Sequence, residues 1–194
     1  YGIDISEYQG VVNWEKLAEI VKDHNISFIM IRSTAGKDHR DRYFTSNWRE
    51  AKNKGIIRAA YHYYRPNENS IDQADFFIKN VQLEPGDLPP VLDIEQISDV
   101  QSVSSLISGL SSWIKKIEDH YGVKPIIYSG AYFYKKYLLG KFPDYVLWVA
   151  NYSKSKEPLA EFKWSFWQYT DEGNIRGIKG PVDLDVFRGN DTEL

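Results

Sequence analysis

The chain has 194 residues, 42% of them hydrophobic, with 6 Trp, 14 Tyr and 9 Phe, a composition that supports a packed core and excludes a disordered protein. Its net charge of -3 and its scattered basic residues argue against a nucleic-acid partner, and no apolar run reaches the ~20 residues that span a membrane. The absence of cysteine excludes disulfides and thiolate chemistry. No linker is visible, so we predict one domain over residues 1–194.

Strand-like and helical patterns alternate over the first two thirds of the chain. Apolar runs predict strands at residues 2–6, 27–34, 56–64, 88–96 and 124–129. Apolar residues at helical spacing follow each run, starting near residues 14, 44, 71, 100 and 132. Asn13 is suited to cap the first helix, and the third begins behind Ser70. Gly55 and Gly122 are suited to end the second and fourth helices.

The last third of the chain breaks this alternation. Residues 144–152, 164–170 and 182–187 resemble strands, but the segments between them hold turn residues and no helical periodicity. A regular (β/α)8 barrel needs ~250 residues, so we predict an α/β fold, an irregular TIM-like barrel of about eight strands whose last strands lack their helices. The alternative is an open doubly wound sheet, but the glycine-rich loop that usually follows its first strand is missing from "SEYQG".

Acidic residues fall at the ends of three predicted strands. The segment "LPPVLDIEQ" presents Asp93 and Glu95 on one face, about 7 Å apart along the backbone, at the C-terminal end of the fourth strand, where active sites of parallel barrels gather. Asp4 lies on the first strand, and Asp183 and Asp185 lie on the last. Because the first and last strands of a closed barrel are neighbours, we expect these carboxyl groups to converge at one mouth.

Converging carboxyl groups indicate acid catalysis. Burial and repulsion between Asp93 and Glu95 would keep Glu95 protonated near neutral pH, while its neighbours stay ionised. Glycoside hydrolysis needs such a pair, because the leaving oxygen must receive a proton as positive charge develops on the sugar. Any single acid here is as readily explained as a helix cap or a surface charge, but three converging strand ends favour a catalytic site.

Other chemistries fit the sequence less well. Asp-x-Glu and Asp-x-Asp can hold calcium or magnesium, but no EF-hand loop is present, and His24, His39, His62 and His120 form no zinc-binding motif. His62 lies inside a strand, and we interpret it as a hydrogen-bonded core residue. Ser129 lacks the Gly-x-Ser-x-Gly turn of serine hydrolases. We therefore expect no metal and no cofactor.

Aromatic residues lie near the same strand ends. Sugar rings have apolar faces and polar rims, which aromatic side chains with hydroxyl or amide neighbours suit well. We expect about half of these residues to fill the core only. They are Tyr61, Tyr63, Tyr128, Trp148, Trp167 and Tyr169, with Gln168 between the last two.

Several motifs together resemble a known family. "GIDISEYQG", "AYHYYR", "PPVLDIE", "KPIIYSG", "LWVANY", "FWQYT" and "VDLDVF" occur in the order and approximate spacing of glycoside hydrolase family 25, the muramidases that cleave bacterial peptidoglycan. The resemblance spans essentially the whole chain. It implies an irregular β/α barrel that hydrolyses the β-1,4 bond between N-acetylmuramic acid and N-acetylglucosamine without a metal.

The resemblance also implies roles for single residues. Glu95 matches the general acid of the family, and Asp93 matches the carboxylate two residues before it. Asp4 and Asp183 match the other acids of the pocket. Tyr128 matches a tyrosine near the reacting sugar.

Three further residues match positions that line the substrate. They are Tyr61, Trp148 and Gln168. Asp185 lies where the resemblance implies a more variable residue, so the choice between Asp183 and Asp185 as the acid of the last strand stays open.

The resemblance favours a retaining mechanism. The acetamido oxygen of the substrate would attack the anomeric carbon, Asp93 would orient the acetamido group, and Glu95 would donate a proton and then activate water. Direct attack by Asp93 and an inverting route stay open, because rotamers can set an i, i+2 pair closer together or farther apart.

Two rival functions are a chitinase-like hydrolase and a carbohydrate-binding module descended from such an enzyme. The presence of both Asp93 and Glu95 argues against lost catalysis. With peptidoglycan as substrate, we expect a monomeric protein that is secreted or associated with the cell wall.

Overall fold

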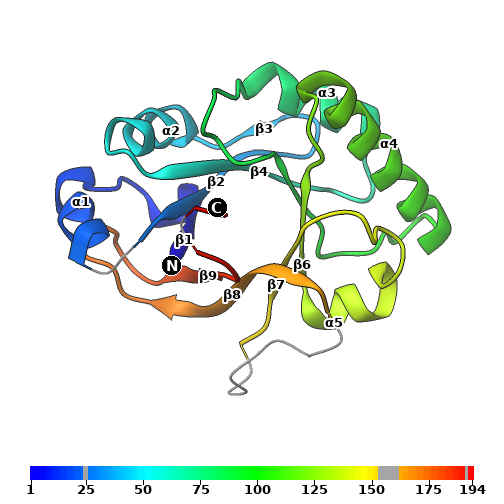
Figure 1. The fold of residues 1–194 in the computed structure, drawn as a ribbon. Coiled ribbons are helices and arrows are strands. Elements are labelled where there is room, and N and C mark those ends of the chain that lie inside the picture. Colours follow the sequence, from blue (N-terminus) through cyan, green and yellow to red (C-terminus); the bar gives the residue numbers. More distant parts are fainter. Residues whose placement is uncertain (24–25, 153–161, 191) are drawn as a thin grey trace.

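The computed structural model describes residues 1–23, 26–152, 162–190 and 192–194, so His24 lies outside the described residues. Eight strands form a closed barrel (Figure 1), because β1 pairs with β2 on one side and with β9 on the other. This confirms the predicted barrel. Its strands are β1 (Gly2–Ile5), β2 (Phe28–Ala35), β4 (Ile57–Tyr63), β5 (Val91–Asp93), β6 (Ile126–Gly130), β7 (Leu147–Ala150), β8 (Trp164–Gly173) and β9 (Val182–Phe187).

The helices lie on the outside of the barrel (Figure 1). They are α1 (Trp14–Asp23), α2 (Phe44–Asn53), α3 (Ser70–Asn80), α4 (Val103–Tyr121) and the short α5 (Ala131–Phe133), which continues into a π-helical turn η2 (Tyr134–Leu138). Asn13 caps α1 as predicted, since its Oδ1 accepts from the Lys16 amide at 3.1 Å. The cap of α3 is Asn69 rather than Ser70. Gly122 ends α4 as expected, with a φ of 71°.

Strand β9 runs antiparallel to both of its neighbours, which the sequence pattern did not predict. A parallel return needs a crossover of a dozen or more residues, whereas an antiparallel one needs only a turn. Residues 174–181 connect β8 to β9 without a helix, as expected for the last strands. The other expected connection without a helix includes residues 153–161, which lie outside the described residues. A two-residue strand, β3 (His39–Arg40), pairs with the end of β2.

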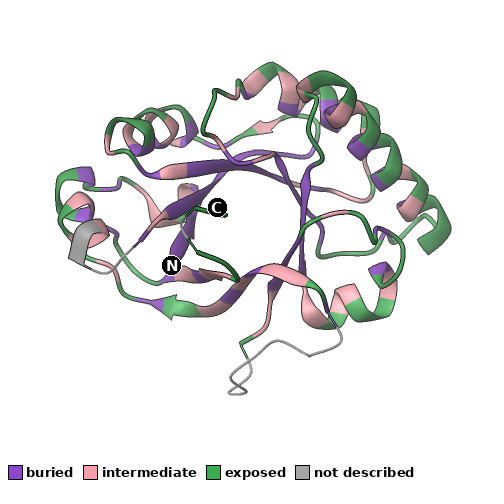
Figure 2. Ribbon diagram, viewed as in Figure 1, coloured by how far each residue is buried: buried purple, intermediate pink, exposed green. Residues whose placement is uncertain are grey.

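The core has two layers, because successive side chains of a strand point to opposite faces. Phe28 and Met30 of β2 pack inside the barrel with residues of the facing strands, whereas Ile29 and Ile31 pack outward against the helices. Strands β1, β2, β4, β5 and β6 are accordingly buried on both faces over most of their length, whereas β8 and β9 are partly exposed (Figure 2). Polar side chains at inward positions near the C-terminal strand ends are therefore the ones that open onto the barrel mouth.

His62 is part of the outer core layer, as interpreted from the sequence. Its Nδ1 lies 2.8 Å from Thr34 Oγ1, its Nε2 lies 3.2 Å from Gln73 Oε1, and its ring stacks on Trp113. Burial lowers the pKa of His62 to about 3, so the imidazole is neutral. This histidine supports the fold.

Candidate active site

The segment from Asp93 to Glu95 is fixed by its backbone. Asp93 is the last residue of β5, and its carbonyl accepts from the Tyr64 amide at 2.8 Å. The carbonyl of Ile94 accepts from Ser129 Oγ at 2.8 Å. Ile94 points into the apolar outer layer of the core, so the side chains before and after it face the mouth of the barrel.

Asp93 and Glu95 interact directly, since their side chains are hydrogen-bonded to each other. Asp93 is 4% exposed, and burial, then repulsion by Glu95, raises its pKa well above the usual range. Glu95 reaches the solvent of the mouth, yet desolvation by the surrounding walls still raises its pKa. Two carboxyl groups can form this bond only if one of them carries a proton. The pKa of Glu95 is therefore raised in the expected direction, with burial as the main cause.

The acids of the first and last strands lie in the same cavity as this pair. Asp4 and Asp183 are direct cross-strand partners, and both line a cavity of about 610 Å³ together with Asp93 and Glu95. Burial raises the pKa of Asp4 well above its usual range and that of Asp183 to about 6. Asp185 does not line the cavity: it is fully buried, and burial raises its pKa to about 8.

Gln168 links this acidic wall to two tyrosines. Its Nε2 donates to Asp4 Oδ2 at 2.6 Å, and its Oε1 accepts from the Tyr128 hydroxyl at 2.7 Å and from the Tyr152 hydroxyl at 2.6 Å. These three bonds fix the orientation of an amide that is only 3% exposed. Tyr152 was missed by sequence reasoning, although it lies in the quoted motif "LWVANY".

Aromatic residues form the floor of the cavity. Tyr61, Tyr128 and Trp148 all line it, and the Tyr128 ring lies 4.3 Å from the Trp148 ring. Trp167 and Tyr169 do not, because they alternate with the inward Gln168 on β8 and so belong to the outer face of the barrel. The structure thus separates the aromatic residues that line the cavity from those that do not, a distinction that the sequence alone could not make.

Arg32 is a second residue that sequence reasoning missed. Its side chain lines the cavity, where Nε lies 3.1 Å from Asp41 Oδ2 and Nη2 lies 3.1 Å from Glu7 Oε1. Its positive charge lowers the pKa of Asp93, against the larger effect of burial. A signal was present in the sequence, because Arg32 stands two residues after the inward Met30 and therefore faces the barrel interior.

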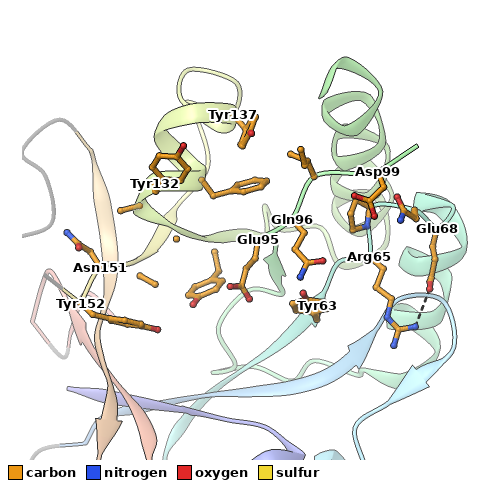
Figure 3. A pocket seen from close by; sticks show the side chains of 18 residues that line it. Tyr63, Arg65, Glu68, Glu95, Gln96, Asp99, Tyr132, Tyr137, Asn151 and Tyr152 are labelled. Carbon is orange, nitrogen blue, oxygen red and sulfur yellow. Dashed lines mark hydrogen bonds and ion pairs between the residues drawn. The ribbon is translucent and has the colours of Figure 1, made fainter. Parts of the chain in front are cut away.

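A second cavity of about 1110 Å³ continues the first, and Glu95 lines both. Figure 3 shows the Glu95 side chain pointing into this cavity, with Tyr63 and Gln96 on one side and Tyr152 on the other. Exposed aromatic side chains, among them Tyr132, line its far end. The two cavities therefore form one groove that extends in both directions from Glu95.

Within the described ranges, no three His, Cys, Asp or Glu side chains are arranged to hold a metal ion. None of the helices in these ranges combines the length and apolar character needed to cross a membrane.

Comparisons with known proteins agree with this geometry. The profile of glycosyl hydrolases family 25 matches residues 3–178, a range that contains Asp4, Asp93 and Glu95. Over its whole length the chain is 40% identical to the Escherichia coli (strain K12) protein YegX, of which it covers 71%. It is 33% identical to lysozyme M1 of Streptomyces globisporus, of which it covers 69%. The crystal structure of the bacterial lysozyme from Streptomyces coelicolor is similar, with a TM-score of 0.88 and 31% identity over 100% of this chain and 94% of that one. The chain therefore belongs to glycosyl hydrolase family 25 and is a glycoside hydrolase.

Proposed function

We propose that this glycoside hydrolase is an N-acetylmuramidase, a lysozyme that cleaves the β-1,4 bond between N-acetylmuramic acid and N-acetylglucosamine in peptidoglycan. The relatives named as lysozymes support this substrate. The observation that carries the proposal is the position of Glu95 in a groove that is lined on both sides of it. Such a groove accepts the interior of a polymer, whereas a closed pocket would accept only a chain end.

In the proposed reaction, Glu95 is the general acid and then the general base. The pair of Asp93 and Glu95 holds one proton, which lies on Glu95 when the substrate is bound. Glu95 then donates it to the leaving glycosidic oxygen while the substrate's acetamido oxygen bonds to the anomeric carbon. Asp93, now ionised, accepts the acetamido N–H and balances the positive charge of the intermediate. A water that is deprotonated by Glu95 opens the intermediate and restores the acetamido group, so the anomeric configuration is retained.

The remaining site residues have supporting roles in this proposal. Asp4 and Asp183 form the wall that faces the developing positive charge. Tyr128 lies close enough to Asp93 to contact the acetamido group, because the two residues are paired in register on adjacent strands. Tyr61, Trp148 and Gln168 contribute buried surface below the sugar. We further propose that the protein acts as a monomer outside the cytoplasm or at the cell wall.

Product analysis tests the proposed function. Purified peptidoglycan is digested, the products are reduced with borohydride, and mass spectrometry identifies the sugar at the new reducing end. Reduced muramic acid is the expected result, whereas reduced glucosamine would identify a glucosaminidase. Release of chitooligosaccharides without action on peptidoglycan would favour a chitinase-like enzyme. Binding of muropeptides without new reducing ends would favour a carbohydrate-binding module.

A further inference from the structure

Asp185 is a buried acid that the mechanism above does not use. It is 0% exposed, on the inward face of β9, in register with Gly2 of β1 and Gln168 of β8. Its Oδ1 accepts from Trp148 Nε1 at 2.8 Å. Its Oδ2 is buried and has no hydrogen-bond donor among the described residues. A buried, ionised carboxylate with one free oxygen is costly, so the second oxygen requires an explanation.

The carboxyl group of Asp4 supplies this explanation. The side chains of Asp4 and Asp185 are hydrogen-bonded to each other. Two carboxyl groups can form such a bond only if one of them carries a proton, because ionised carboxylates have acceptor oxygens only. Gln168 occupies the other side of Asp4. The Asp4 carboxyl is therefore held between a fixed amide and a second carboxyl that is itself held by Trp148.

We propose that Asp185 is a positioning residue of the active site, which shares one buried proton with Asp4 and thereby holds the Asp4 carboxyl at the cavity wall. This inference rests on the proposed function, because it assigns Asp185 a role through Asp4 in that reaction. Asp185 itself touches neither the cavity nor the substrate. Its effect on turnover passes through the position and charge of Asp4.

The surroundings of Asp185 decide when it ionises. Burial and the charge of Asp183 raise the pKa of Asp185 to about 8, against the opposing effects of the bonds from Trp148 and Asp4 and of the N-terminal amine of Tyr1. Burial, and then the charge of Asp185, raises the pKa of Asp4 well above its usual range, so Asp4 keeps the shared proton when Asp185 ionises. The charge of Asp185 also acts on the phenol of Tyr169 on β8, whose pKa is raised mainly by burial.

Two substitutions separate this role from a purely structural one. Asp185→Asn keeps an oxygen for Trp148 and offers Asp4 an N–H that does not titrate. Asp185→Leu removes both bonds at similar volume. Asp87→Asn is the matched control, because Asp87 is a largely buried acid that is paired with Arg58 and does not line the cavity.

We expect the kcat of Asp185→Asn on peptidoglycan to exceed that of Asp185→Leu by about tenfold, because only asparagine keeps a bond to Trp148 and a bond to Asp4. KM should be nearly the same in the two variants, because Asp185 does not line the cavity. Equal kcat values in the two variants, or a wild-type kcat in Asp185→Leu, would overturn the inference.

A second measurement needs no turnover, so it remains decisive if the proposed function fails or if Asp185→Leu does not fold. The folded-state pKa of Asp185 lies above its usual value of 3.8, so between these values the native state binds a proton that the unfolded chain has lost. Wild-type stability must then fall as pH rises from 5 to 8. The urea midpoint of the wild type, relative to Asp185→Asn, should fall over this range, while Asp87→Asn stays parallel to the wild type. A pH-independent difference between wild type and Asp185→Asn would contradict a shared proton.

Discussion

Replacing Gln168 by leucine tests whether the polar network at the cavity wall is held by this one amide. Leucine has a similar size and removes three hydrogen bonds, those to Asp4, Tyr128 and Tyr152. Asp4 and the Tyr128 hydroxyl are buried, so neither can replace its lost partner with bulk water. Tyr152 is 48% exposed, and water can take over its bond.

The magnitude follows from the number of buried groups that lose a partner. The Tyr128 hydroxyl is left unpaired, which costs about 1–3 kcal/mol, and Asp4 loses one hydrogen bond but keeps that to Asp185, which adds about 0.5–1.5 kcal/mol. Together these losses are a large share of the roughly 5–15 kcal/mol that stabilises a typical domain. Tyr152→Phe removes only the exposed bond, and we expect it to cost at most about 1 kcal/mol. The structure therefore predicts a clear difference between the two variants.

Urea denaturation of both variants at pH 6, followed by tryptophan fluorescence, measures this difference in the free energy of unfolding. Turnover of peptidoglycan under native conditions gives a second readout, and we expect kcat to fall in Gln168→Leu because Asp4 loses its orienting donor. Equal destabilisation by Gln168→Leu and Tyr152→Phe would refute the reasoning, since it would mean that the buried contacts of Gln168 contribute no more than its exposed one.

Three further predictions concern charges around the site. Arg32→Met should destabilise the fold by about 3–5 kcal/mol in urea denaturation, because it leaves Asp41 without its buried partner; a loss below 1 kcal/mol would contradict this. His62 has a folded-state pKa of about 3, so the unfolded chain binds its proton first and stability falls by about 1.4 kcal/mol per unit as pH drops from 6.5 towards 3. The difference in unfolding free energy between wild type and His62→Gln should show this slope, and a flat difference would argue against a neutral buried histidine. Asp93→Asn should lower kcat by about 10²-fold or more, and Asp4→Asn by less, and the reverse order would require their roles to be exchanged.

Much of the fold was predictable because each strand and helix carries its own periodicity. The continuous apolar run of β2 predicts that its side chains are buried on both faces of the strand, as they are. Gly122 marks the end of α4. The direction of β9 was not predictable, since an alternating strand has the same pattern when read in either direction. The cap of α3 was misplaced by one residue because Asn69 and Ser70 are both good caps, and only the backbone conformation distinguishes them.

The convergence of Asp4, Asp183, Asp93 and Glu95 was predictable from barrel closure alone. The partners of these acids were not, because they depend on loops and rotamers. The loop after β2 returns Asp41 to Arg32, and no local pattern signals that contact. The difference between Asp183 and Asp185 was not predictable either. Asp185 is buried and accepts a hydrogen bond from Trp148, whereas Asp183 lines the cavity, and this depends on packing.

The most direct test of the account is the turnover of Glu95→Gln on purified peptidoglycan, measured by the appearance of new reducing ends. Glutamine has nearly the same shape and cannot donate the required proton, so the variant should keep the wild-type circular dichroism spectrum while kcat falls by about 10²- to 10⁴-fold. Hydrolysis by a folded Glu95→Gln variant at the wild-type rate would contradict the assignment of Glu95 as the general acid.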